Sequence, residues 1–206
     1  MWELIQSGNV MMIPLGVCSL VAVAVIFERV YSLRSSKVIV SEVVGAVETL
    51  DAAQDLSVAR AILERNPGPF ANIVATGLDH AEDDWVIIRD VLQESGRQEA
   101  VRLSRNLNIL EIVAAIAPLL GLLGTVTGMI RVFSAVSAHG LGQPEYMSGG
   151  ISEAMITTAA GLIIGIPVLV MHQWLQGKAD SIIFDMERYG SIVLDSLRRR
   201  NRNRSN

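Results

Sequence analysis

The sequence predicts an all-α integral membrane protein with three transmembrane helices, N-terminus outside and C-terminus inside, whose long helices extend into a cytoplasmic helical domain. Half of the 206 residues are hydrophobic, and they gather in three runs that are each long enough to cross a bilayer as a helix. No segment shows the alternation that indicates a strand. The predicted parts, in order, are a periplasmic N-terminal segment (1–9), a first span (10–27), a cytoplasmic helical domain (28–110), a second span (111–136), a periplasmic loop (137–150), a third span (151–175) and a cytoplasmic C-terminal helix with an arginine-rich tail (176–206).

The first span is interpreted as a retained anchor. Glu3 is the only charge before it, so it lacks the positive region that a secretory signal peptide carries at its start. Its positive charges follow from Arg29 onward, which places the N-terminus outside. The single cysteine, Cys18, lies in this span, so the chain has no intrachain disulfide and no cysteine-based metal site.

The distribution of positive charge predicts the orientation of all three spans. Of the 17 lysines and arginines, only Arg131 lies near the predicted outer side. Because cytoplasmic loops carry the excess of positive residues, the long middle segment and the C-terminal segment are expected inside. Arg131 itself is interpreted as reaching the outer headgroups.

The cytoplasmic domain is predicted to be helical and acidic. Ser57 is placed to cap a helix that ends before Pro67, and Asp83 or Asp84 is placed to cap a longer one. No turn signal separates this longer helix from the second span, so we expect it to continue from the cytoplasm into the membrane. Residues 38–105 hold 12 acidic and 6 basic side chains.

The end of the chain is strongly basic. Five arginines occur between Arg198 and Arg204. Such a run could contact nucleic acid or anionic lipid. We favour the simpler interpretation of a disordered cytoplasmic tail, since arginine, asparagine and serine cannot form a core.

The second span carries small residues and one informative hydroxyl. Gly121, Gly124 and Gly128 predict close contact with another helix. Thr125 shares their face at helical spacing. Its hydroxyl could bond to a carbonyl one turn earlier or line a polar pathway, and the sequence leaves both open. Pro118 removes a backbone donor, which kinks a helix or frees a carbonyl for an ion or water.

The third span carries a carboxylate and two hydroxyls, Glu153, Thr157 and Thr158. Ionisable and hydroxyl groups are expensive in a bilayer and usually face protein or a water path, so these three are candidate ion-pathway residues. On a straight helix Thr157 lies nearer the Glu153 face than Thr158 does. The alternatives are a carboxylate at the helix N-terminus, wetted by the outer interface, and threonines that only pack helices.

Three further residues of the third span are assigned to packing. Gly161 and Gly165 are four residues apart and lie on the Thr158 face, a second signal for close helix contact. Pro167 follows them inside the span, where it removes a backbone donor as Pro118 does.

Motifs of enzymes do not occur in the sequence. There is no glycine-rich phosphate loop followed by Lys-Ser/Thr, no His-Glu-x-x-His and no Gly-x-Ser-x-Gly. The histidines at 80, 139 and 172 are too scattered to argue for a metal site. We therefore predict neither an enzyme nor a metal centre.

The second and third spans together resemble the MotA/TolQ/ExbB proton-channel family, and within it the ExbB/TolQ branch. The resemblance covers the whole three-span architecture, including an ExbB-like opening of the chain. The matching stretches are 117–126 (APLLGLLGTV), 128–130 (GMI), 150–155 (GISEAM), 158–162 (TAAGL) and 166–167 (IP).

The resemblance implies a bacterial inner-membrane protein of Gram-negative type. Such proteins form a pentamer around the single-span helices of a partner similar to ExbD or TolR, whose intramembrane aspartate carries the proton. The complex then moves a TonB- or TolA-like protein that works on the outer membrane. The resemblance places Thr125, Glu153 and Thr158 along the pore. It implies contact with lipid, no nucleic acid and no cofactor.

Several alternatives stay open at this stage. Thr157 stands where the family often has a small apolar residue, and its additional oxygen leaves sodium as an alternative to the proton. The energised process could be ExbB-like import, TolQ-like envelope maintenance, gliding or secretion. A different class of function is a non-conducting helical scaffold whose glycine and threonine faces only pack. A solute transporter is disfavoured, because three spans contain no inverted repeat.

Overall fold

The computed structural model describes residues 10–34, 38–48, 56–139 and 144–204. Throughout these ranges the regular structure is helical and no strand occurs, which confirms the predicted all-α class. The chain divides into two compact units. We call them the membrane unit, Met1–Arg29 with Asn106–Trp174, and the polar unit, Val30–Arg105 with Leu175–Asn206. The predicted periplasmic segment 1–9 lies outside the described residues.

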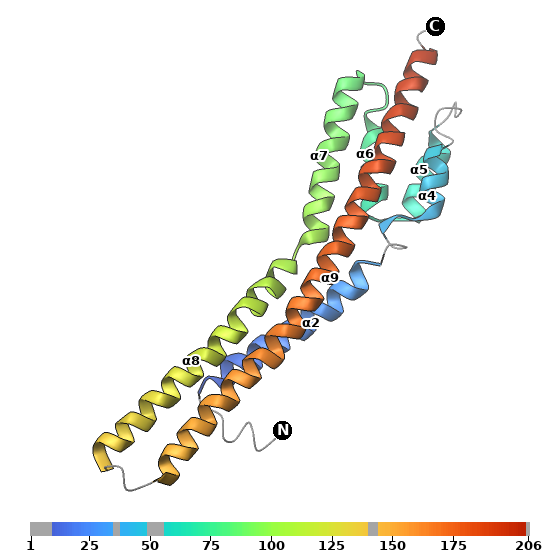
Figure 1. Cartoon of the computed structure of the whole chain (residues 1–206). Helices are drawn as coiled ribbons and strands as arrows, with labels where there is room; N and C mark the ends of the chain where they lie inside the picture. Colours follow the sequence, from blue (N-terminus) through green and yellow to red (C-terminus); the bar gives the residue numbers. More distant parts are fainter. Residues whose placement is uncertain (1–9, 35–37, 49–55, 140–143, 205–206) are drawn as a thin grey trace. The chain divides into compact units, whose positions relative to one another are not determined.

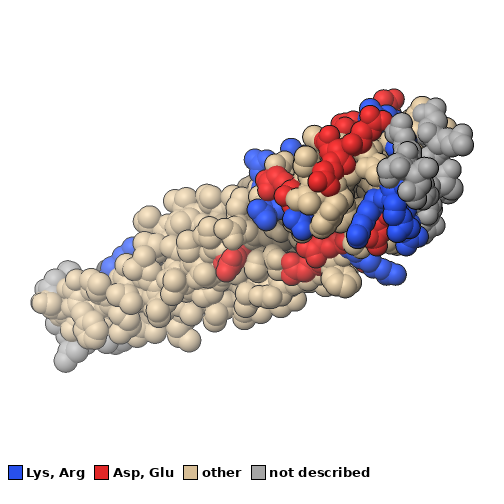
Figure 2. Space-filling view, turned by 90° about the horizontal axis from the view of Figure 1, so that it is seen from above, with Lys and Arg blue, Asp and Glu red and all other residues tan. Residues whose placement is uncertain are grey.

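Three helices supply the membrane unit: α2 (Met12–Ser32), α8 (Leu107–His139) and the first half of α9 (Pro144–Arg204). Each of the three contains a stretch long and apolar enough to cross a membrane, which confirms the predicted number of long apolar helices. Many of their large apolar side chains are exposed, as a lipid- or protein-facing surface requires. In Figure 2 charged atoms are rare on the visible surface of these helices.

The C-terminal end of α2 carries a buried charge. Leu15, Ala22 and Arg29 form its buried stripe at seven-residue spacing. The Arg29 side chain is 6% exposed, and its Nε lies 3.0 Å from Glu28 Oε2. The same carboxylate oxygen accepts a bond from Asn106 Nδ2 at 3.4 Å. A buried guanidinium needs such a partner, because burying an unpaired charge costs several kcal/mol.

The polar unit is a helical cluster built on the second half of α9. Its other helices are α4 (Ser41–Glu48), α5 (Ser57–Arg65), α6 (Pro69–Asp79) and α7 (Trp85–Ser104). The α6 helix is central to the core. Its Phe70 is fully buried and its ring lies 5.8 Å from that of Tyr189 on α9. Four other α6 side chains are buried too, those of Ala71, Ile73, Val74 and Leu78.

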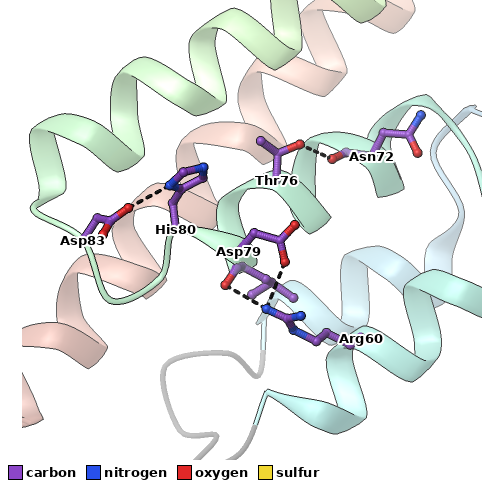
Figure 3. Close-up of polar contacts among 7 residues, drawn as sticks. Arg60, Asn72, Thr76, Asp79, His80 and Asp83 are labelled. Carbon is purple, nitrogen blue, oxygen red and sulfur yellow. Dashed lines mark hydrogen bonds and ion pairs between the residues drawn. The ribbon is translucent and has the colours of Figure 1, made fainter.

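Polar contacts join α5 to α6 and close the turn after α6 (Figure 3). Arg60 Nη2 lies 2.9 Å from Asp79 Oδ1 and donates to the Leu78 carbonyl at 3.4 Å. His80 Nδ1 lies 2.7 Å from Asp83 Oδ2. Both pairs are substantially exposed, so they fix the geometry of the turn more than they add to stability.

The starts of α5 and α7 agree in part with the caps that the sequence predicts. The α5 helix begins at Ser57 and ends at Arg65, before Pro67, as the sequence predicts. Ser57 is the first helical residue and Leu56 is the N-cap, without a side-chain cap bond. The α7 helix follows Asp84, one of the two predicted caps, although the Asp84 side chain makes no cap bond.

The expected continuous helix from the polar region into the second span is wrong. The α7 helix ends at Ser104, and α8 begins at Leu107. Between them Asn106 has a φ of 65°, the left-handed conformation that interrupts a right-handed helix. Asparagine adopts this conformation more readily than most residues, because its short polar side chain bonds locally.

The interpretation of the arginine-rich end as a disordered tail is also wrong. The α9 helix continues through Arg204, and Leu197 within it is fully buried. The Arg198 guanidinium lies 5.5 Å from the centre of the Trp85 ring. Asn201 Nδ2 donates to the Asp83 carbonyl at 3.3 Å. One face of the basic segment therefore belongs to the polar unit and packs against the start of α7.

Candidate functional site

The predicted site residues lie on two helices of the membrane unit, α8 and α9, which pack side by side (Figure 1). The glycines make this packing close. A Cβ added at Gly161 would lie 2.6 Å from the Ala117 carbonyl oxygen, and one at Gly121 would lie 2.9 Å from that of Thr157. These distances are shorter than real Cβ contacts, so only glycine allows the two backbones to approach this far.

The contact continues along the whole hairpin. A Cβ at Gly165 would lie 2.7 Å from Pro118 Cγ, and one at Gly128 would lie 2.8 Å from Ala154 Cβ. The small residues of α8 and α9 thus face each other within one chain. The sequence indicated close helix contact but did not indicate which helix would be the partner.

The two prolines are included in continuous helices. Pro118 lies within α8 and packs on Gly165. Pro167 lies within α9 and is exposed in the single chain. Neither helix is interrupted at its proline.

Thr125 is half-buried on α8. Its Oγ1 donates to the Leu122 carbonyl at 2.6 Å. This is the local back-bond that the sequence left as one of two options. The hydroxyl has only one proton to donate, so its remaining capacity is to accept a hydrogen bond or to ligate a cation.

Thr158 is half-buried on α9 and connects the two helices. Its Oγ1 donates to the Gly121 carbonyl at 3.0 Å. The hydroxyl therefore holds the hairpin together, and like that of Thr125 it keeps its lone pairs for an incoming donor or cation.

Thr157 is fully buried between α8 and α9. It packs on Gly124, where an added Cβ would lie 2.6 Å from Thr157 Cβ. Its Oγ1 donates within its own helix, 2.8 Å from the Ala154 carbonyl and 3.3 Å from that of Glu153. We infer that Thr157 packs the helices, which removes the reason to expect an additional sodium ligand there.

Glu153 lies one turn before Thr157 on α9, and its side chain is 22% exposed. Its Oε1 lies 3.0 Å from Arg131 Nη1 on α8. The pair is formed beside the Gly128–Ala154 contact of the two helices. The Arg131 side chain is 54% exposed, so the ion pair leaves part of the guanidinium accessible, and its reach to the outer headgroups stays a prediction.

Arg131 is the residue of this cluster that the sequence interpretation missed. One signal could have indicated it. Along α8, Arg131 is the only charge after Glu111, and Glu153 is the only charge of α9 between Ile151 and Gly177. Two opposite charges alone in apolar helices are expected to pair when those helices form a hairpin, because a lone charge in a bilayer is costly.

Three apolar helices of membrane length, with a carboxylate and hydroxyls on a glycine-packed hairpin, define a multi-pass membrane protein of the channel or transport-subunit class. Residues 65–188 match the MotA/TolQ/ExbB proton channel family. The chain therefore belongs to this family, and to its ExbB branch.

Named relatives agree with this assignment. The biopolymer transport protein ExbB-like 1 of Synechocystis is 36% identical over 177 residues, which are 82% of this chain and 68% of the relative. The biopolymer transport protein exbB1 of Vibrio cholerae is 30% identical over 203 residues, 95% of this chain and 89% of the relative. The Tol-Pal system protein TolQ of Haemophilus influenzae is 32% identical over 96 residues, 47% of this chain and 41% of the relative.

Proposed function

We propose that the chain is the channel subunit of an inner-membrane complex that converts an ion gradient, with the proton as the ion, into mechanical work. The family supports a proton-channel-type energising subunit. The observation that carries the proposal is that Thr125, Glu153 and Thr158 all lie on the α8–α9 hairpin, which bears the family motifs. The two hydroxyls keep lone pairs free to accept a hydrogen bond or ligate an ion.

The proton carrier is proposed to come from a second protein. Between Ile112 and His139 of α8 there is no acidic residue, and between Ala154 and Ala179 of α9 there is none either. A proton crossing the middle of a bilayer needs a titratable group there. An ExbD- or TolR-like single-span partner with an intramembrane aspartate supplies one, and a ring of five copies of this chain encloses it.

The energised protein is proposed to be TonB-like, acting in outer-membrane import. Two ExbB-named relatives align over 82% and 95% of this chain, some other ExbB-named relatives over 50% and the TolQ relative over 47%. The two long alignments are the support for import rather than a TolA-like role in envelope maintenance. The proposed location is the inner membrane of a Gram-negative cell.

The proposed orientation of the protein in the membrane follows from the distribution of its positive charges. Apart from Arg29 and Arg131, every lysine and arginine of the chain lies in the polar unit. The positive-inside tendency therefore places the polar unit in the cytoplasm and the Arg131–Glu153 end of the hairpin on the periplasmic side.

The proposal is tested at Thr158 in the complete complex with its partner. Thr158→Val keeps the shape and removes the oxygen, and we expect it to lower ion-driven activity at least tenfold. Thr158→Ser is the matched control, because it keeps the oxygen and its bond to Gly121. Native mass of the detergent-purified complex checks that both variants assemble. Full activity in both Thr158→Val and Glu153→Gln would leave the scaffold alternative standing.

A further inference from the structure

We propose that Arg131 is a positioning residue for Glu153: it holds the carboxylate directed toward α8 until an incoming proton neutralises the carboxylate. The inference rests on the proposed function, since it assigns a role at one end of the same pathway. Its observation is the contact between Arg131 Nη1 and Glu153 Oε1, 3.0 Å apart and on different helices.

The backbone arrangement shows why the two groups meet. Arg131 follows Gly128 by three residues, and Glu153 directly precedes Ala154. An added Cβ at Gly128 would lie 2.8 Å from Ala154 Cβ and 3.2 Å from the Gly150 carbonyl oxygen. The two helices are therefore held close where the charged side chains leave them, which brings the guanidinium and the carboxylate within reach of each other.

The environment gives the pair its importance. An isolated carboxylate in an apolar helix tends to take up a proton, because its charged form is poorly solvated there. A guanidinium stays charged under all working conditions and bonds carboxylates with a planar fork. The Glu153 side chain is 22% exposed and that of Arg131 is 54% exposed, so the carboxylate is the more enclosed group of the two.

Two hydroxyls, those of Thr157 and Thr158, follow the Glu153 carboxylate within the next five residues of α9. The hydroxyl of Thr157 donates its proton to the carbonyls of Glu153 and Ala154 in its own helix, so we assign it no part in the pathway. The next hydroxyl along α9 is that of Thr158, which donates to Gly121 on α8. A proton that binds to the Glu153 carboxylate forms an O–H bond and cancels the charge that attracts Arg131. The neutral acid is then free to turn, and loss of its proton restores the ion pair.

The test uses the full complex in detergent or vesicles and a hydrophobic carbodiimide, which reacts with protonated carboxyl groups. The label on Glu153 is measured by mass spectrometry at one fixed neutral pH. We expect Arg131→Gln to raise labelling at Glu153 at least threefold, because the charged form has lost its partner. Arg131→Lys should label close to the wild-type level. Glu111, exposed near the start of α8, is the internal reference and should not change.

Two further results complete the test. Ion-driven activity should fall at least fivefold in Arg131→Gln and recover in Arg131→Lys, with the mass of the assembled complex unchanged. Labelling of Glu153 in Arg131→Gln at the wild-type level, or equal labelling in the glutamine and lysine variants, would overturn the proposal. Because labelling needs no ion-driven activity, this outcome is separate from a failure at Thr158, which would refute the proposed function instead.

Discussion

At the scale of single residues, the three threonines of the hairpin differ in which carbonyl receives their proton. Thr125 bonds back within α8, Thr157 bonds back within α9, and Thr158 bonds across from α9 to α8. Thr157 is also fully buried, whereas the other two are half-buried. Oxygens of the same chemistry therefore differ in burial, with two partly exposed and one enclosed between the helices.

This separation predicts that Thr157 can lose its hydroxyl without loss of function. Thr157→Val keeps the β-branched shape against Gly124 and removes only a bond within its own helix, so ion-driven activity should stay within twofold of wild type. Activity should also be independent of a sodium gradient. The measurement is energised transport by the full complex with and without sodium, beside Thr158→Val. A loss as large as that of Thr158→Val, or a loss only in sodium, would place Thr157 on the pathway.

The sequence could propose candidate residues here but not their contacts. Hydroxyls and one carboxylate stand out in apolar spans, so composition and spacing name Thr125, Glu153, Thr157 and Thr158, and the family resemblance selects the first, second and last of them. The burial of Thr157 depends on how α9 is rotated against α8, which periodicity does not define. The Arg131–Glu153 pair joins residues 22 positions apart on two helices, and only the hairpin geometry brings them together.

At the scale of elements, the hairpin of α8 and α9 depends on glycines that meet the backbone of the facing helix. The Ala117 carbonyl oxygen would lie 2.6 Å from a Cβ at Gly161, and a backbone atom cannot rotate away as a side chain can. Gly177, on the same helix, has no atom within 4 Å of such a Cβ. The two positions therefore offer a matched pair of substitutions in one element.

Gly161→Ala is expected to destabilise the protein, and Gly177→Ala to stabilise it. The first forces the helices apart, at a cost of about 1–3 kcal/mol for an overpacked contact. The second replaces glycine in a helix interior, a gain of roughly 1 kcal/mol. Thermal unfolding of the detergent-purified chain measures both as a lower and a higher Tm. Equal Tm values for the two variants would mean that the α8–α9 contact is not the one described.

The elements were predicted unevenly, for physical reasons. Membrane-length apolar runs identify α2, α8 and α9 without ambiguity, since few other structures bury so many consecutive apolar residues. The break before α8 was missed because Asn106 is a weak stop signal inside a helical pattern. The helical end of α9 was missed because arginine-rich composition indicates disorder, while Leu197 and the Trp85–Arg198 contact supply the packing that orders it.

At the scale of the whole molecule, charge separates the two units. The membrane unit has Arg29 and Arg131 as its only lysine or arginine residues, and both have carboxylate partners. The polar unit carries the rest, and red and blue atoms gather on it in Figure 2. A bilayer around the membrane unit alone would thus cover few unpaired charges. The positive-inside tendency then predicts which end of each span faces the cytoplasm.

The predicted orientation can be read by labelling two engineered cysteines in a Cys18→Ser background. Ser137→Cys lies near the end of α8 and Asp195→Cys lies on α9 in the polar unit, and both native side chains are exposed. A membrane-impermeant maleimide, added to cells with a permeabilised outer membrane, should label position 137 at once. Position 195 should be labelled only after the inner membrane is opened, because the polar unit is expected in the cytoplasm with the arginines that keep it there. The cysteine-free chain is the blank, and a permeant maleimide should label both sites in intact cells. The reverse order of labelling would invert the topology, place the Arg131–Glu153 pair on the cytoplasmic side, and make it the exit of the pathway.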